Sequence, residues 1–207
     1  MAKNILMKLL VAVLFCLPVL TRSVAQNNAS RQTGSKTKVE TSYDEKKGET
    51  IARIGPFELY RPPQNSVSGE LNFERIDLTV SFSYPGKRIA KPLSVMLVVF
   101  AASEGGARFE KKRDLSFKTD SGQYDLGEME FVGKGEGYVQ TNVSRGQREI
   151  LVSEVLRKSI PFDQFAQIAK SGTAEIKIGR SKLRLEKKHL EAFRNFVYLM
   201  EQEGLEF

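Results

Sequence analysis

Two groups of basic residues are the part of the sequence that could do chemistry most directly. The first holds four cations in six residues, next to Gly105-Gly106: Arg108, Lys111, Lys112 and Arg113. The second lies near the end of the chain: Arg180, Lys182, Arg184, Lys187 and Lys188. Clustered cations attract anions, so converging groups would hold a polysaccharide, a lipid head group or an acidic protein surface. Alternatively, lysines on an edge strand serve only to prevent edge-to-edge aggregation.

A pair of acidic residues supplies an alternative. Glu128 and Glu130 are two residues apart in an expected strand, where side chains at that spacing share a face. Two nearby carboxyl groups in different environments can divide the roles of general acid and general base. The pair therefore predicts, as an alternative, an exported carboxylate-based hydrolase that acts on envelope glycans. Alternating charge on an exposed strand explains the same residues equally well.

Other catalytic and ligand-binding patterns are missing from the sequence. His189 is the only histidine and Cys16 the only cysteine, whereas a zinc site needs three or four ligands. Residues 133–137 alternate glycine with charge, but a phosphate loop must lead into a helix and Tyr138 begins an extended pattern. We therefore expect no catalytic residue, no metal site and no cofactor. His189 should lie at the surface or at a helix rim, and 133–137 should form a flexible loop.

Alternating apolar and polar residues predict the strands that would position these groups. Apolar side chains occupy every second position from Ile76 to Tyr84, which is the period of a strand with one buried face. Residues 93–102 are apolar on both faces, so they should form a central strand that is covered on both sides. Shorter strands are expected at 57–60, 115–117, 124–126, 129–131 and 150–156, with a turn at 120–122 and a bulge near Glu154.

Helical patterns occur only in the last third of the chain. Pro161 and Asp163 suit the first turn of a helix, and Gly172 suits its end. A second helix over about 186–201 would bury an apolar stripe: Leu190, Phe193, Phe196, Val197 and Met200. Between the helices, two short strands should meet at a Gly179-Arg180 turn. The pattern predicts an α+β fold: a mainly antiparallel sheet with two C-terminal helices packed on one face or end. A β-sandwich with an appended helical pair is the nearest alternative.

The first 25 residues have the layout of a secretory signal peptide. Lys3 and Lys8 precede an apolar run over residues 9–20, and small residues lead to Ala25, which predicts cleavage before Gln26. The run is shorter than the ~20 residues that a membrane-spanning helix needs, so we expect no transmembrane segment after cleavage. A cleaved chain would hold no cysteine, which favours a bacterial periplasmic or secreted protein over an animal extracellular one.

The remainder divides into a polar linker and one domain. Residues 26–50 are too polar to bury much apolar surface, which predicts a disordered linker, and 51–207 suit a single α+β domain. Loss of residues 1–25, which hold three basic and no acidic side chains, would lower the formal charge from +7 to +4. A charge of this size does not indicate nucleic acid as a partner.

The chain from Leu93 onward resembles an uncharacterised family of bacterial domains in which strands precede a helix–hairpin–helix tail. The resemblance rests on short segments: 107–109, 114–117, Asp120 with Gly122, 150–154, and the tail from Phe162 through Gly179 to Phe193. It covers just over half of the chain. The resemblance implies the fold of that family and no activity.

These patterns favour an exported, non-enzymatic domain with a binding or structural role. Its expected partner is an anionic envelope component or another protein. An anion- or glycan-binding module that uses the basic groups, and the exported hydrolase, are the alternatives.

Overall fold

The computed structural model describes residues 39–62, 74–142, 147–202 and 204, which form ten strands and two helices. The predicted signal peptide at 1–25, with its cleavage site at Ala25 and Gln26, lies outside these residues. The strands are β1 (Glu40–Asp44), β2 (Glu49–Tyr60), β3 (Arg75–Pro85), β4 (Ser94–Glu104), β5 (Asp114–Thr119), β6 (Gln123–Glu128), β7 (Glu130–Asn142), β8 (Gln147–Pro161), β9 (Ala174–Ile178) and β10 (Ser181–Leu185). The helices are α1 (Phe162–Lys170) and α2 (Lys187–Met200).

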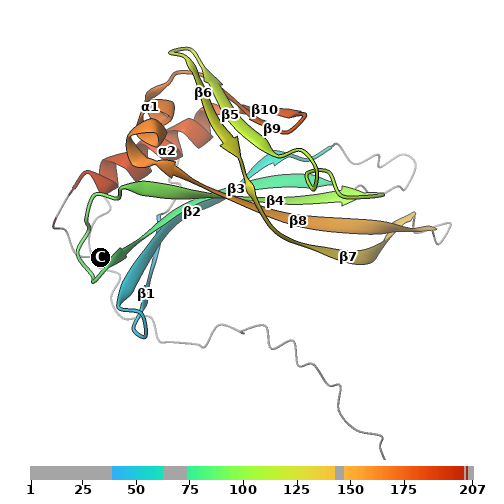
Figure 1. Cartoon of the computed structure of the whole chain (residues 1–207), viewed down its shortest axis with the longest axis horizontal. Coiled ribbons are helices and arrows are strands. Elements are labelled where there is room, and N and C mark those ends of the chain that lie inside the picture. The colour runs from blue at the N-terminus through green and yellow to red at the C-terminus, as the bar shows by residue number, and fades with distance from the viewer. Residues whose placement is uncertain (1–38, 63–73, 143–146, 203, 205–207) are drawn as a thin grey trace, which may run out of the picture. The chain divides into compact units, whose positions relative to one another are not determined.

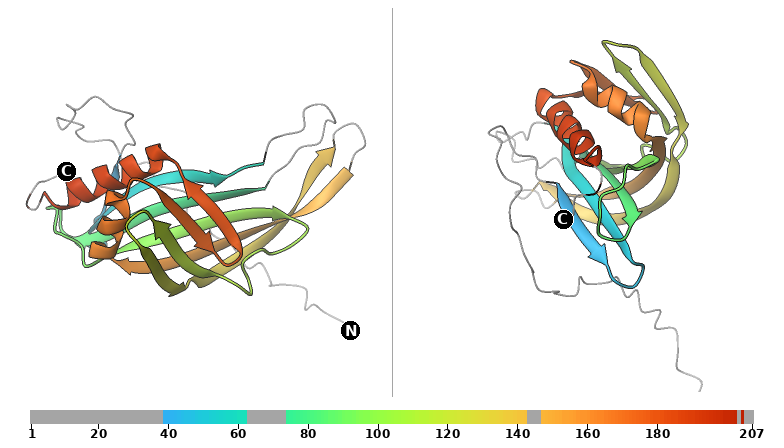
Figure 2. Two further views of the ribbon diagram at one scale, coloured as in Figure 1. Left: turned by 90° about the horizontal axis from the view of Figure 1, so that it is seen from above. Right: turned by 90° about the vertical axis from the view of Figure 1, so that its left-hand side faces the viewer.

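The strands form two antiparallel sheets (Figure 1). The large sheet has the order β1-β2-β3-β4-β8-β7, and the small sheet has the order β10-β9-β5-β6. Both helices and the small sheet lie on the same side of the large sheet (Figures 1 and 2). We call that side the inner face and the opposite side the outer face. The predicted α+β class, with a mainly antiparallel sheet and two C-terminal helices, is confirmed.

The hydrophobic core fills the space between the inner face and the elements that cover it. The predicted alternation in β3 is confirmed, because Ile76, Leu78, Val80, Phe82 and Tyr84 are all buried. From the other side, Phe165 of α1 and Phe193 of α2 meet with ring centroids 5.2 Å apart. Burying large aromatic side chains in this way contributes much of the free energy that holds the layers together.

The outer face differs from the sequence-based expectation for residues 93–102. β4 is central, as predicted, but only its inner side chains, such as Leu97 and Val99, are fully buried. Met96, Val98 and Phe100 are half-buried on the outer face, where no described element covers them. Flanking strands shield these side chains from the sides, so a central strand can be apolar on both faces without a second covering layer.

Two segments predicted to lack regular structure are strands. Residues 40–44, expected in the disordered linker, form β1 and pair with β2, which itself begins at Glu49. Polar side chains are compatible with an edge strand because its pairing is made by the backbone. Residues 133–137, expected as a flexible loop, lie within β7 and pair with β8. Gly135 faces Ser153, whose Oγ would lie 3.0 Å from an added Cβ, so the strands approach closely at that glycine.

The predicted bulge near Glu154 is also wrong. β8 pairs with β4 in one uninterrupted register, and Val152, Glu154 and Leu156 all face inward. The irregularity lies instead in β7, between Phe131 and Gly133. Glu154 is therefore a buried carboxylate in an otherwise apolar row, and its partners determine the shape of the site described below.

Candidate functional site

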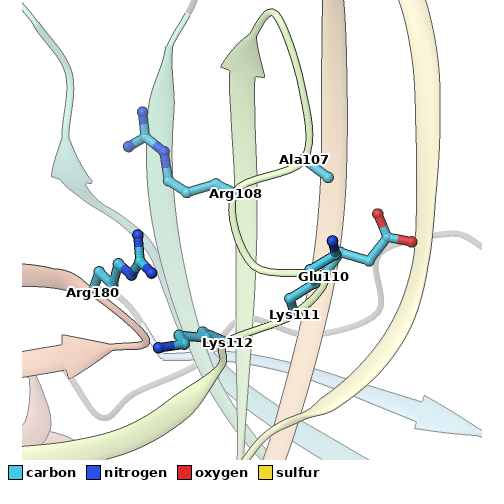
Figure 3. Close-up of a pocket in the computed structure, with 6 residues that line it drawn as sticks. All are labelled: Ala107, Arg108, Glu110, Lys111, Lys112 and Arg180. Atoms are coloured by element: carbon cyan, nitrogen blue, oxygen red, sulfur yellow. The ribbon is translucent and has the colours of Figure 1, made fainter.

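The two basic groups partly converge in the structure. Residues 105–113, which connect β4 to β5, form what we call the basic loop. A shallow pocket of about 380 Å³ lies against this loop (Figure 3). Its lining is Ala107, Arg108, Glu110, Lys111, Lys112 and Arg180. Three members of the first group and one member of the second group thus share one site.

Glu154 anchors the basic loop from beneath. Its carboxylate accepts a hydrogen bond from the main-chain N–H of Arg108 at 2.6 Å and from that of Phe109 at 3.0 Å. Glu154 is fully buried and Phe109 is 1% exposed, so the loop is fixed both by these bonds and by a core aromatic. Hydrogen bonds to a buried carboxylate are strong, and they offset part of the cost of burying its charge.

Ion pairs hold the loop from both sides. Arg108 Nη2 lies 3.0 Å from Glu74 Oε1, and its guanidinium lies 5.8 Å from the ring centroid of Tyr60. Glu110 Oε2 lies 3.5 Å from Lys134 Nζ of β7. Arg108 and Glu110 accordingly extend in opposite directions from the loop (Figure 3). The only acidic side chain of the pocket lining is therefore paired with a lysine of β7.

Arg113 belongs to the predicted basic group, but its side chain binds other parts of the protein and is not available to a ligand. Its Nε donates to the carbonyl of Met129 and its Nη1 to the carbonyl of Glu110, both at 2.7 Å. Its Nη2 lies 2.7 Å from Glu128 Oε1. Because these groups occupy the guanidinium, Arg113 closes the base of the loop and does not line the pocket.

Gly179 brings the β9–β10 turn onto the basic loop. Its N–H donates to the carbonyl of Asp114 at 2.9 Å, and its φ is +56°. A Cβ at this position would overlap the carbonyl oxygen of Lys112. Only glycine permits both the left-handed backbone and this approach. The contact places Arg180, the next residue, against the pocket.

Three cations of the pocket remain available to a ligand. Lys111, Lys112 and Arg180 are exposed, and none makes an ion pair with another described residue. Figure 3 shows the charged ends of Arg108, Lys112 and Arg180 on one side of the loop, with Glu110 turned to the other. The pocket thus presents a net positive charge on a loop whose backbone is held in place.

The other predicted anion-binding residues lie elsewhere. Lys182 and Arg184 alternate with buried Leu183 and Leu185 in β10, so they point to the exposed face of the small sheet. Lys187 Nζ lies 3.9 Å from Glu191, and Lys188 Nζ lies 2.7 Å from Glu186. None of these four basic residues lines the pocket.

The carboxylates proposed for a hydrolase are exposed and paired with arginines. Glu128 is bound to Arg113, and both carboxylate oxygens of Glu130 accept hydrogen bonds from Arg157 at 2.7 Å. Their side chains are 57% and 58% exposed. The hydrogen bond from Arg157 lowers the pKa of Glu130. Glu130 is therefore ionised near neutral pH and has no proton to donate as a general acid. This arrangement argues against the hydrolase alternative.

His189 is buried, contrary to the predicted surface position. It is 2% exposed, its ring centroid lies 5.4 Å from that of Phe57, and its Nδ1 accepts a hydrogen bond from the main-chain N–H of Glu186 at 3.2 Å. The Glu186 side chain in turn binds the His189 backbone, which completes a capping box. Burial lowers the pKa of His189, and the Glu186 carboxylate partly opposes that effect. Glu186 and His189 are three residues apart, which is the spacing of a capping box, and this spacing was the sequence signal that could have placed His189 in the first turn of α2.

Sequence reasoning missed Glu154 as the anchor of the site. The available signal was an acidic residue inside an apolar run, which is costly unless the fold supplies hydrogen-bond donors. The donors are the main-chain N–H groups of the basic loop, more than 40 positions earlier in the chain. No sequence pattern connects the two segments.

Comparisons with family models, with curated proteins and with solved structures give no match to this chain. The resemblance from Leu93 onward therefore stays a prediction. Among the described residues, no helix is long and apolar enough to cross a membrane. In the same part of the chain, no three His, Cys, Asp or Glu side chains are grouped so that they could hold a metal ion.

Proposed function

We propose that this chain is a non-enzymatic binding domain that captures an anionic ligand at the pocket of the basic loop. The observation that carries the proposal is the meeting of Arg180 with Arg108 and Lys112 at one pocket, although the two groups are far apart in the sequence. Separate contacts hold the backbone of the loop and of the turn, so the segments that carry the cations are in place before a ligand binds. Such preorganisation lowers the entropic cost of binding.

The export of the protein is part of the same proposal. It rests on the signal-peptide pattern of residues 1–25, which predicts a periplasmic or secreted protein. In that setting the ligand is an anionic component of the cell envelope. The exposed, arginine-bound state of Glu128 and Glu130 supports a binding role over hydrolysis.

The test is the affinity for dextran sulfate, a polyanion, measured by isothermal titration calorimetry. Two double variants remove the same charge: Lys112→Ala with Arg180→Ala in the pocket, and Lys182→Ala with Arg184→Ala on the small sheet. We expect the pocket variant to bind at least about tenfold more weakly, because two direct charge contacts are lost. The small-sheet variant should lose much less.

Salt dependence supplies the control for electrostatic binding. The Debye length falls from about 30 Å at 0.01 M to about 3 Å at 1 M ionic strength, so binding by the pocket should weaken steeply over that range. Equal losses in the two double variants would overturn the proposal, because net charge alone would then explain the binding. Absence of binding by the unmodified chain at low salt would overturn it as well.

A further inference from the structure

The large sheet ends in a long edge strand, β7. Within the described residues β7 pairs only with β8, on one side. It has 13 residues, whereas the other three edge strands, β1, β6 and β10, have five, six and five. The β7–β8 hairpin also extends past the small sheet and both helices (Figures 1 and 2). An edge of this length is a template for a further strand, because every second residue directs its N–H and C=O away from the sheet.

The side chains of β7 make the strand complementary to a second copy of itself. Lys134 and Glu136 share the inner face, since they lie opposite Glu154 and Val152 of β8. The positions between and beside these two charges are all glycines: 133, 135 and 137. If two β7 strands pair antiparallel about a two-fold axis at residue 135, Lys134 of each copy lies directly opposite Glu136 of the other. Opposite charges at facing positions stabilise a strand pair.

The charges also select this register over its neighbours. A two-fold axis at Lys134 would place two lysines opposite each other, and an axis at Glu136 would place two glutamates opposite each other. Like charges at facing positions are destabilising. In the register about residue 135, Val132 of one copy lies opposite Tyr138 of the other, and these side chains are 51% and 78% exposed. Pairing removes part of their apolar surface from water.

The contacts of Lys134 within one copy leave it able to bind a second copy. Its Nζ lies 3.5 Å from Glu110 Oε2 and 3.8 Å from Glu136 Oε1, which are long distances for ion pairs. The side chains of Lys134 and Glu136 are 41% and 59% exposed. A lysine has three N–H donors, so a further carboxylate across the strand edge can be accommodated. Charges that would block pairing with an unrelated strand therefore favour pairing with an identical one.

We infer that this chain forms a two-fold homodimer in which two β7 strands pair antiparallel about residue 135. The two large sheets then continue into each other, and one face of the interface carries two Lys134–Glu136 contacts. A two-fold interface uses the same surface on both subunits, which is the property that the β7 side chains show. No residue of β7 lines the pocket of the basic loop, so the inference does not depend on the proposed function.

Sedimentation velocity tests the dimer and its charge contacts. The full chain should show a monomer–dimer equilibrium that shifts towards the dimer as concentration rises. Glu136→Lys should raise the dimer dissociation constant at least about tenfold, because it replaces two opposite-charge contacts with two like-charge contacts. Glu45→Lys makes the same change of charge in the exposed turn between β1 and β2, and it should leave the constant unchanged. Circular dichroism checks that both variants keep the fold.

Cysteine crosslinking tests the register. Residue 133 of one copy lies opposite residue 137 of the other, with Cα atoms about 4.5–5.5 Å apart, a separation that a disulfide can bridge. An added Cβ at Gly133 or Gly137 meets no atom within 4 Å. With Cys16→Ser in every chain, a mixture of Gly133→Cys and Gly137→Cys chains should form disulfide-linked dimers on mild oxidation. Either variant alone should form few, because its two thiols lie about 14 Å apart along the strands.

Three outcomes would overturn the inference. The first is a monomer at every concentration up to about 500 µM. The second is a dimer whose dissociation constant is the same with and without Glu136→Lys. The third is equal crosslinking in the mixture and in the separate variants, which would place the contact between copies elsewhere. None of these outcomes changes the expected loss of dextran sulfate affinity in the pocket double variant, so the two proposals fail separately.

Discussion

The carboxylate of Glu154 lies 3.0 Å from the main-chain nitrogen of Phe109, and this contact joins β8 to the basic loop. The same carboxylate receives the N–H of Arg108 at 2.6 Å. The Glu154 acceptor and the Phe109 donor are withdrawn from bulk water, since Glu154 is fully buried and Phe109 nearly so. The orientation of the candidate site thus depends on a residue that does not line it.

Glu154→Ala should destabilise the protein by about 3 kcal/mol, because two donors lose a charged acceptor and a cavity opens beside Phe109. Glu154→Gln keeps the shape and one carbonyl acceptor, so we expect it to cost less. Chemical denaturation with urea measures both free energies of unfolding. Equal stability of Glu154→Ala and the unmodified chain would show that the loop is not anchored by this contact.

Gly179→Ala should separate the β9–β10 turn from the basic loop. The added Cβ would overlap the carbonyl oxygen of Lys112, in addition to the strain of a side chain at φ +56°. The matched control is Gly105→Ala, which has φ +78° and nothing within 4 Å of the added Cβ. We expect about 1 kcal/mol for the control, from backbone strain, and at least about 2 kcal/mol for Gly179→Ala. Thermal unfolding measures both, and equal costs would contradict the close contact.

His189 should make stability depend on pH. Burial lowers its pKa in the folded state below the ordinary value of 6.5, so the unfolded chain binds the proton more tightly. The contribution is complete above pH 6.5 and is lost progressively as the pH falls below that value towards the lowered pKa. Unfolding free energies measured between about pH 7.5 and about pH 5.5 should therefore decline.

The control for this pH effect is His189→Gln, because glutamine at the same helix position can still accept a hydrogen bond from the Glu186 N–H. This variant should show a flatter pH profile over the same interval, whatever its stability at neutral pH. An unchanged slope would assign the pH dependence to other groups, such as exposed carboxylates.

The pattern at the start of the sequence predicts cleavage between Ala25 and Gln26. Expression of the full chain in a Gram-negative bacterium, followed by fractionation and mass spectrometry, should find a protein beginning at Gln26 outside the cytoplasm. Lysine substitutions at Val11 and Leu14 would break the apolar run and should retain the chain inside the cell. Export with an intact N-terminus would contradict the cleavage prediction.

Local patterns were sufficient for much of the fold. The alternation from Ile76 to Tyr84 predicts β3, and the apolar stripe from Leu190 to Met200 predicts α2, because each depends on the geometry of one element. The same approach failed for residues 40–44, which have few apolar side chains. β1 forms there through backbone hydrogen bonds to β2, and those depend on a partner strand rather than on local side-chain pattern.

The sequence by itself determined the strand and helix periods and the excess of basic residues. Only the tertiary structure decided which cations line one pocket. Arg180 reaches the pocket because Gly179 packs on Lys112, whereas Lys182, two residues later, points to the exposed face of the small sheet. Arg113 does not line the pocket, because its guanidinium donates hydrogen bonds to two main-chain carbonyls. Such distinctions depend on contacts between segments far apart in the chain, and the order of residues along one segment does not contain them.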